Sequence, residues 1–125
     1  MDKKKDSRLY NKNFIEAWKK ATGGIVYAVK TQRNIKIQLC IAVLVIIFAI
    51  VFKVNITQAM FLTFATMLVI ITEMVNTAIE ETVNLVTNKF HPVAKIAKDV
   101  AAGAVVLSAL NAVIIAMFIF VNKII

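Results

Sequence analysis

Apolar residues in this chain gather into three long runs, at residues 35–52, 56–72 and 100–121, with short polar segments between them. A helix needs about 20 apolar residues to cross the roughly 30 Å hydrocarbon core of a bilayer. The first and third runs are close to that length, and the second reaches it only by continuing through Glu73. The pattern therefore predicts three transmembrane helices, and it places the Glu73 carboxylate near the membrane interface.

The polar segment before the first run, residues 1–34, becomes helical in pattern from Phe14 onward. Apolar side chains recur on one face at helical spacing, and lysines occupy the other face. Trp18 on the apolar face is typical of an amphipathic helix that lies in the membrane interface. We therefore expect a charged leader over residues 1–12, followed by a surface helix with a bend at Gly23–Gly24.

Composition agrees with this arrangement. The 125 residues are 60% hydrophobic, with a mean hydropathy of +0.79, which is too apolar for an ordinary soluble domain of this size. We find neither an internal repeat nor a linker long enough to separate two domains. The sequence predicts an all-α integral membrane protein that forms a single domain over residues 1–125.

Basic residues are distributed unevenly along the chain. Ten of the 15 Lys and Arg residues lie at or before Lys36, three lie between the second and third runs, and Lys53 and Lys123 lie elsewhere. Positive charge collects on the cytosolic side of membrane proteins. We therefore expect the N-terminal arm and residues 84–99 in the cytosol, and the turn at residues 53–55 and the C-terminus outside.

Charge and cysteine content also limit the partners of the protein. A basic arm can bind nucleic acid, but next to membrane spans attraction to anionic lipid headgroups is the simpler explanation, so we expect no nucleic-acid partner. Cys40 is the only cysteine and lies inside an apolar run. Neither an internal disulfide nor a cysteine-based metal site is therefore available.

A polar stripe follows the second apolar run. At about 100° per residue, Glu73, Asn76, Glu80 and Asn84 fall within one arc of a helix. Ionisable groups that border a membrane span are rare and mark functional sites. Glu73 is the most informative of the four, because no lysine or arginine lies three or four residues away to pair with it.

These residues supply parts that phosphoryl transfer needs. No glycine-rich phosphate loop is present, so a nucleotide would have to be bound by lysines and by metal-bound carboxylates. Phosphoryl transfer requires Mg²⁺ on the phosphates, a cation near the transferred group and a base for the attacking hydroxyl. Glu73 and Glu80 provide carboxylates, Asn76 can orient an oxygen, and Lys98 and Asp99 add a cation and a further acid.

Several of these residues also have purely structural interpretations. Asp99 is placed to cap the N-terminus of the third span, and Lys98 to extend toward lipid headgroups. Glu81 points away from the stripe and is best explained as a solvated charge. His91–Pro92 is expected to end the second helix and start the loop.

The third run suggests how the helices pack. It opens with the small residues 101–104, which let helix backbones approach closely in lipid. Ser108 and Asn111, one turn apart, are expected to hydrogen-bond across helices. Three spans make a thin bundle, so we expect a homo-oligomer with sites between chains.

Two motifs together resemble the small prokaryotic diacylglycerol kinase family. Residues 73–80 have the pattern ExxNxxxE, and residues 91–105 contain Ala97-Lys98-Asp99. With a matching block at residues 30–34, the resemblance extends from Phe14 to the C-terminus, and it is closest to the Gram-positive branch, many of whose members are undecaprenol kinases. It implies a homotrimer in the bacterial cytoplasmic membrane that transfers the γ-phosphate of ATP to a lipid alcohol at the cytosolic face, undecaprenol being preferred over diacylglycerol.

By resemblance, Glu73 matches the family's catalytic base and Asn76 the residue beside the reacting phosphate. Glu80 matches a Mg²⁺ ligand, and Lys98 and Asp99 match nucleotide contacts. The family usually has Glu, a second metal ligand and nucleotide contact, where this chain has Gln32. It usually has Asp at the position of Asn84. A glutamine oxygen can bind Mg²⁺ but brings no charge, so Gln32→Glu is expected to strengthen the Mg²⁺ dependence.

Two alternatives stay open. A small proton-coupled transporter or a pore would use Glu73 as an intramembrane acid, although the small multidrug transporters typically have four spans and an acid within the first. Here residues 39–52 of the first span contain no acid. A catalytically degenerate family member that binds lipid is the other alternative, because Gln32 and Asn84 replace acids.

Overall fold

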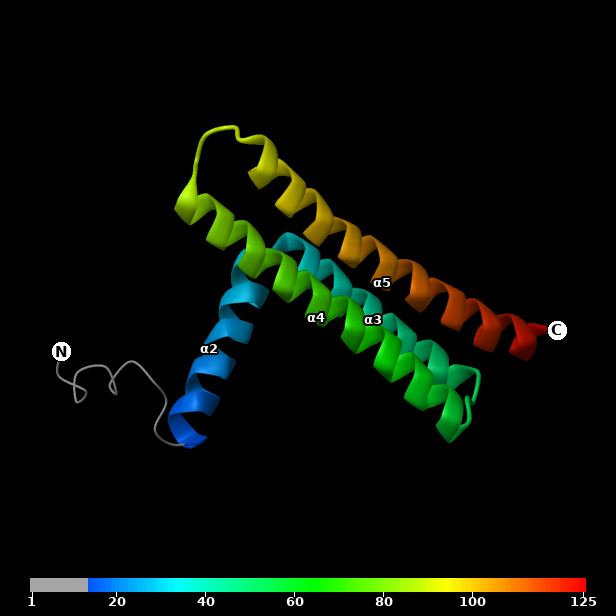
Figure 1. The fold of residues 1–125 in the computed structure, drawn as a ribbon. Coiled ribbons are helices and arrows are strands. Elements are labelled where there is room, and N and C mark those ends of the chain that lie inside the picture. Colours follow the sequence, from blue (N-terminus) through cyan, green and yellow to red (C-terminus); the bar gives the residue numbers. More distant parts are fainter. Residues whose placement is uncertain (1–13) are drawn as a thin grey trace. The chain divides into compact units, whose positions relative to one another are not determined.

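The structure, a computed structural model, describes residues 14–125. The charged leader expected at residues 1–12 lies outside the described residues. The described part of the chain forms four helices, with no strand between them (Figure 1). The chain divides into two compact units, Met1–Thr31 and Gln32–Ile125. The first contains helix α2, and the second contains the three helices that carry the apolar runs.

Helix α2 spans Phe14–Thr31 and continues without interruption through the pair of glycines at its centre. Two aromatic rings near its start, Phe14 and Trp18, stack with their centroids 6.2 Å apart. Both side chains are exposed. The helix predicted from Phe14 onward is confirmed. Its position in the membrane interface stays a prediction.

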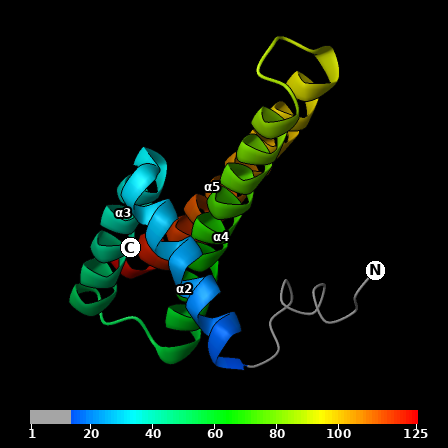
Figure 2. The same cartoon turned by 90° about the vertical axis from the view of Figure 1, so that its left-hand side faces the viewer.

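Helices α3 (Arg33–Val51), α4 (Ile56–Val86) and α5 (Pro92–Ile124) form the second unit. The views in Figures 1 and 2 both show α5 running alongside α4, and α3 also packs against α4. These are the three described helices long and apolar enough to cross a membrane. The chain is accordingly a membrane protein, and the three predicted spans fall within these helices, α3 ending one residue before the first span does.

The turn between α3 and α4 is held by two local motifs. Lys53 has a φ of 50°, in the left-handed region, and the next residue, Val54, donates its backbone N–H to Ala49 O at 3.1 Å. This closes the carbonyl end of α3. Asn55 and Gln58 then form a capping box at the start of α4. The polar residues that separate the first two apolar runs are therefore used to satisfy two helix ends.

The turn between α4 and α5 differs from the sequence-based prediction. Helix α4 ends at Val86, and His91 caps the next helix, its Nδ1 accepting a hydrogen bond from the Val93 N–H at 3.1 Å. Pro92 occupies the first turn of α5, where its missing N–H costs nothing. The prediction that His91–Pro92 ends the second helix is wrong. So is the interpretation of Asp99 as a helix cap, because α5 already begins at Pro92.

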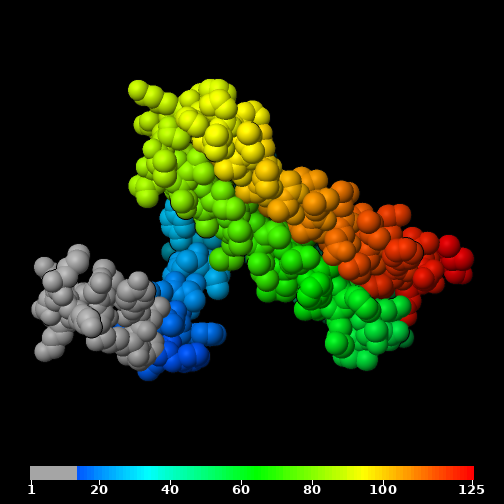
Figure 3. Space-filling model, in the orientation of Figure 1, coloured from blue at the N-terminus to red at the C-terminus, as the bar shows by residue number. Residues whose placement is uncertain are grey.

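Few side chains are buried in this unit, and those that are lie mostly where α4 meets its neighbours. The buried apolar side chains are Ile35, Leu62, Ala65, Ala101 and Ile119, while most large apolar side chains of α3, α4 and α5 are exposed. Figure 3 shows α4 and α5 in contact along much of their length. The outer surfaces of both helices carry many exposed apolar side chains. Such surfaces need lipid or other helices to cover them.

Candidate active site

Glu73 is a buried carboxylate at the contact between α3 and α4. Its side chain is 3% exposed, and its Oε1 accepts a hydrogen bond from Asn34 Nδ2 at 3.2 Å. Among the described residues, no lysine or arginine forms an ion pair with it. A buried carboxylate held by one neutral amide is energetically costly. The structure thus supports the view that Glu73 is more than a packing residue.

Asn34 was not singled out by sequence reasoning, although it belongs to the block at residues 30–34. Asn34 lies in the first turn of α3, and its partner Glu73 lies 39 residues away in sequence. No local pattern joins the two positions. A signal was present only in the polarity of Asn34 at the start of an apolar run.

Asn76 and Glu80 lie on the next two turns of α4 and contact each other. Asn76 Nδ2 donates to Glu80 Oε1 at 3.3 Å. The other amide atom of Asn76, Oδ1, is buried and has no hydrogen-bond partner among the described residues. Buried polar atoms without partners are rare in native proteins. Asn76 therefore presents an acceptor to which a donor or a cation can bind.

Lys98 of α5 reaches across to α4. Its Nζ donates to Asn84 Oδ1 at 2.6 Å, and Asn84 lies one helical turn after Glu80. The lysine is half-buried. The contact gives its ammonium group a fixed position near the end of the polar stripe, so the interpretation of Lys98 as a side chain that only extends toward headgroups is incomplete.

Asp99 has a different partner from Lys98. It forms an ion pair with Lys95 one turn earlier on α5, and both side chains are exposed. Asp99, Lys98 and Asn84 border the same cavity of about 380 Å³ at the α4–α5 turn. Its lining residues are Val83, Asn84, Thr87, Asn88, Lys89, Phe90, His91, Ala94, Lys95, Lys98 and Asp99. The cavity is therefore rich in cationic and amide groups.

Gln32 immediately precedes α3, in extended backbone, and its side chain does not cap the helix. It is therefore two residues from Asn34, the partner of Glu73. Within residues 14–125, no cluster of three or more His, Cys, Asp or Glu side chains is placed to hold a metal ion. One carboxylate, Glu80, with amide oxygens nearby still suits Mg²⁺, which takes few protein ligands and fills its shell with waters and phosphate oxygens.

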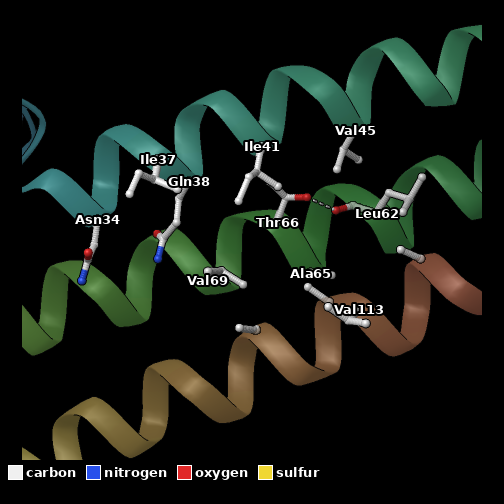
Figure 4. A pocket seen from close by; sticks show the side chains of 13 residues that line it. Asn34, Ile37, Gln38, Ile41, Val45, Leu62, Ala65, Thr66, Val69 and Val113 are labelled. Carbon is white, nitrogen blue, oxygen red and sulfur yellow. Dashed lines mark hydrogen bonds between the residues drawn. The ribbon is translucent and has the colours of Figure 1, made fainter.

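A second cavity, of about 400 Å³, opens between α3, α4 and α5 (Figure 4). It begins at Asn34 and is lined almost entirely by apolar side chains. Its lining residues are Asn34, Ile37, Gln38, Ile41, Val45, Leu62, Ala65, Thr66, Val69, Ala109, Ala112, Val113 and Ala116. We call this cavity the apolar groove. Small residues on α4 and α5 leave room for it, a property that sequence reasoning did not detect.

Two polar side chains of the apolar groove differ in their bonding. Thr66 Oγ1 donates to Leu62 O on its own helix at 2.7 Å, as the dashed line in Figure 4 shows. Gln38 projects from α3 toward α4, and its Oε1 is buried without a hydrogen-bond partner in the described part of the chain. The groove therefore has one polar position that is not satisfied internally.

Packing between α4 and α5 includes a polar contact. The hydroxyl oxygens of Thr72 and Ser108 lie 2.8 Å apart. The predicted cross-helix hydrogen bond is therefore confirmed for Ser108, and that of Asn111 stays a prediction. The bond lies one residue before Glu73 on α4, so it fixes α5 against α4 beside the buried carboxylate.

Comparisons with known proteins match most of this chain to one protein family. Residues 19–120 match the protein family described as prokaryotic diacylglycerol kinase. The chain is 37% identical to an undecaprenol kinase of Bacillus subtilis over 119 residues, covering 95% of this chain and 97% of that protein. It is 41% identical to a diacylglycerol kinase of Synechocystis over 104 residues, covering 82% of this chain and 59% of that longer protein.

Proposed function

Because the chain belongs to the prokaryotic diacylglycerol kinase family and is a lipid kinase, we propose that it transfers the γ-phosphate of Mg-ATP to the hydroxyl of undecaprenol. The observation that carries this proposal is the position of Glu73, a buried carboxylate whose partner Asn34 lines the apolar groove. A lipid chain in the groove would bring its hydroxyl end to the carboxylate. The B. subtilis relative, matched over almost its whole length, supports the choice of undecaprenol.

In the proposed reaction, Glu73 accepts the proton of the lipid hydroxyl while that oxygen attacks the γ-phosphorus. A new phosphorus–oxygen bond forms, the bond from the γ-phosphorus to the β,γ-bridging oxygen breaks, and ADP leaves. Asn34 holds the carboxylate in place through its amide hydrogen bond. Burial of Glu73 keeps bulk water away from the attacking oxygen.

The remaining polar residues would bind the nucleotide. Lys98 and Asp99 border the polar cavity at the α4–α5 turn and would contact ATP there. Asn76, with its unpartnered Oδ1, would orient the reacting phosphate or its metal-bound water. Glu80 and Gln32 would hold Mg²⁺, which when bound neutralises charge on the phosphates.

Location and assembly extend the proposal. The distribution of basic residues favours a bacterial cytoplasmic membrane protein with the N-terminus and active site in the cytosol and the C-terminus outside. Extensive exposed apolar surface on α3, α4 and α5 is compatible with a homotrimer whose sites lie between chains. The product, undecaprenyl phosphate, would return a cell-wall lipid carrier to use.

Diacylglycerol is the second candidate acceptor, and Gln38 is the observation that favours it. The Nε2–H group of Gln38, in the lining of the groove, can donate a hydrogen bond to an ester carbonyl, which diacylglycerol has and undecaprenol lacks. The Synechocystis relative is named for that activity. Both acceptors share the same alcohol chemistry, so the two candidates differ in the lipid and not in the reaction.

The decisive experiment measures phosphate transfer from radiolabelled ATP to undecaprenol and to diacylglycerol in parallel mixed micelles, with and without Mg²⁺. The purified chain is compared with Glu73→Gln and with Glu81→Gln, a matched change at an exposed carboxylate of the same helix. Mg²⁺-dependent labelling of undecaprenol that Glu73→Gln abolishes and Glu81→Gln retains would support the proposal. Stronger labelling of diacylglycerol would replace the acceptor. Labelling of neither lipid by folded protein would favour the degenerate-member alternative.

A further inference from the structure

We infer that Asn84 is a positioning residue that holds the Lys98 ammonium for a nucleotide phosphate without neutralising its charge. This inference rests on the proposed function, because it assigns the phosphate to ATP. It starts from one contact, the 2.6 Å hydrogen bond from Lys98 Nζ to Asn84 Oδ1 across α5 and α4. Both residues border the polar cavity at the α4–α5 turn.

The number of donors on the lysine is the first step. An ammonium group carries three N–H donors and no acceptor. Asn84 takes one of them, and in the described part of the chain no second acceptor is hydrogen-bonded to Lys98. The two remaining donors can bind two phosphate oxygens. A single contact to a neutral amide thus fixes the nitrogen and leaves most of its binding capacity unused.

Charge balance is the second step. Lys95, one turn earlier on the same helix, is paired with Asp99, so its charge is compensated. Lys98 makes no ion pair within residues 14–125, and its partner is an uncharged amide. Lys98 is also half-buried, whereas Lys95 is exposed. A charge that is fixed, partly shielded from water and uncompensated attracts an anion more strongly than one already paired.

The position of Asn84 supplies the third step. Asn84 lies one turn of α4 after Glu80. Glu80 in turn contacts Asn76, which lies one turn before it. The ammonium is therefore held in line with the residues expected to meet the metal-bound phosphate. A carboxylate at position 84 would pair with Lys98 and compete with the phosphate for it.

The opposing account treats Asn84 as the loss of an acid that the family usually has at this position. If Asn84 stands where an acid is needed for Mg²⁺, restoring the acid should improve metal binding and turnover. If Asn84 keeps Lys98 available, the same change should weaken nucleotide binding. The two accounts therefore predict opposite results for Asn84→Asp.

The experiment compares Asn84→Asp with Asn88→Asp, which adds the same charge to the lining of the same cavity at a residue that does not contact Lys98. Nucleotide affinity is measured by displacement of a fluorescent ATP analogue from the full-length protein, first without Mg²⁺ and then with it. Steady-state KM for ATP and for the lipid, and kcat, are measured on the same preparations.

We expect Asn84→Asp to weaken ATP binding about fivefold with and without Mg²⁺, the upper end of the scale for an exposed charged contact, while Asn88→Asp changes it less than about twofold. KM for ATP should rise with little change in KM for the lipid. Asn84→Ala, which removes the contact but adds no charge, should weaken ATP binding less than Asn84→Asp.

Equal effects of the two aspartate substitutions, or tighter Mg²⁺ dependence and faster turnover in Asn84→Asp, would overturn the inference. Failure of the proposed function looks different, since the unmodified protein would then bind ATP without transferring phosphate to lipid, or would not bind it. The binding assay without Mg²⁺ separates the effect on Lys98 from any effect on metal.

Discussion

Asn34 donates a hydrogen bond to the buried carboxylate of Glu73 at 3.2 Å, and this contact joins the start of α3 to the middle of α4. Asn34 lines the apolar groove. The one buried carboxylate of the described residues is therefore next to the space in which a lipid chain would fit. The proposed chemistry depends on this relationship more than on any other.

Removal of the Asn34 amide should therefore slow the chemical step. We expect Asn34→Ala to lower kcat about 10- to 100-fold with little change in KM for ATP, because a misplaced base affects transfer more than nucleotide binding. Lys36→Ala, an exposed residue of the same helix, is the control. Initial rates with saturating lipid test this, and an unchanged kcat in Asn34→Ala would remove Asn34 from the mechanism.

The apolar groove should limit the size of the acceptor. Ala112→Phe places a large ring among the small residues of the lining and should raise KM for a long-chain acceptor about 10-fold or more, with KM for ATP unchanged. Val106→Phe, at an exposed position of α5 outside the lining, makes the matched control. If both variants behave alike toward undecaprenol, the lipid chain lies elsewhere.

Gln32→Glu tests whether the residue before α3 is a weakened metal ligand. A carboxylate adds a charged oxygen that Mg²⁺ prefers to an amide, so we expect half-maximal activity at a lower Mg²⁺ concentration and a higher rate. Glu80→Gln should shift the Mg²⁺ titration in the opposite direction. An Mg²⁺ titration that does not move in Gln32→Glu would argue against a metal at this position.

The Thr72–Ser108 contact should contribute to stability but not to nucleotide binding. We expect Ser108→Ala to lower the unfolding free energy by about 0.5–1.5 kcal/mol, the range for hydrogen bonds between membrane helices. Thr72→Val and the double variant complete a cycle that isolates the coupling between the two hydroxyls. Unfolding in mixed micelles measures it, and a coupling energy near zero would mean that the contact is incidental.

Much of this architecture follows from local sequence. Run length and hydropathy determine that α3, α4 and α5 can each cross a membrane, because crossing depends on the composition of one helix at a time. The 3.6-residue period likewise determines that Glu73, Asn76 and Glu80 share one side of α4, and the Asn76–Glu80 hydrogen bond agrees. The family could also be inferred from the motifs at residues 73–80 and 91–105.

Helix boundaries were less predictable. The ends of α4 and α5 at the turn that joins them are polar and charged, so both helices extend well beyond their apolar runs there. His91 and Pro92 are compatible with the end of one helix or with the start of the next. In the structure His91 accepts a hydrogen bond from the Val93 N–H, and this bond places the two residues at the start of α5. Asp99 lost its expected capping position for the same reason.

Contacts between helices could be decided only by tertiary structure. Asn34 meets Glu73 and Asn84 meets Lys98 because packing sets the rotation and the axial offset of each helix against α4. The apolar groove arises in the same way, where small residues of α4 and α5 face α3. A sequence determines which side chains share a face of one helix, but the partner of that face depends on how separate helices pack, and side-chain volume in three dimensions decides that.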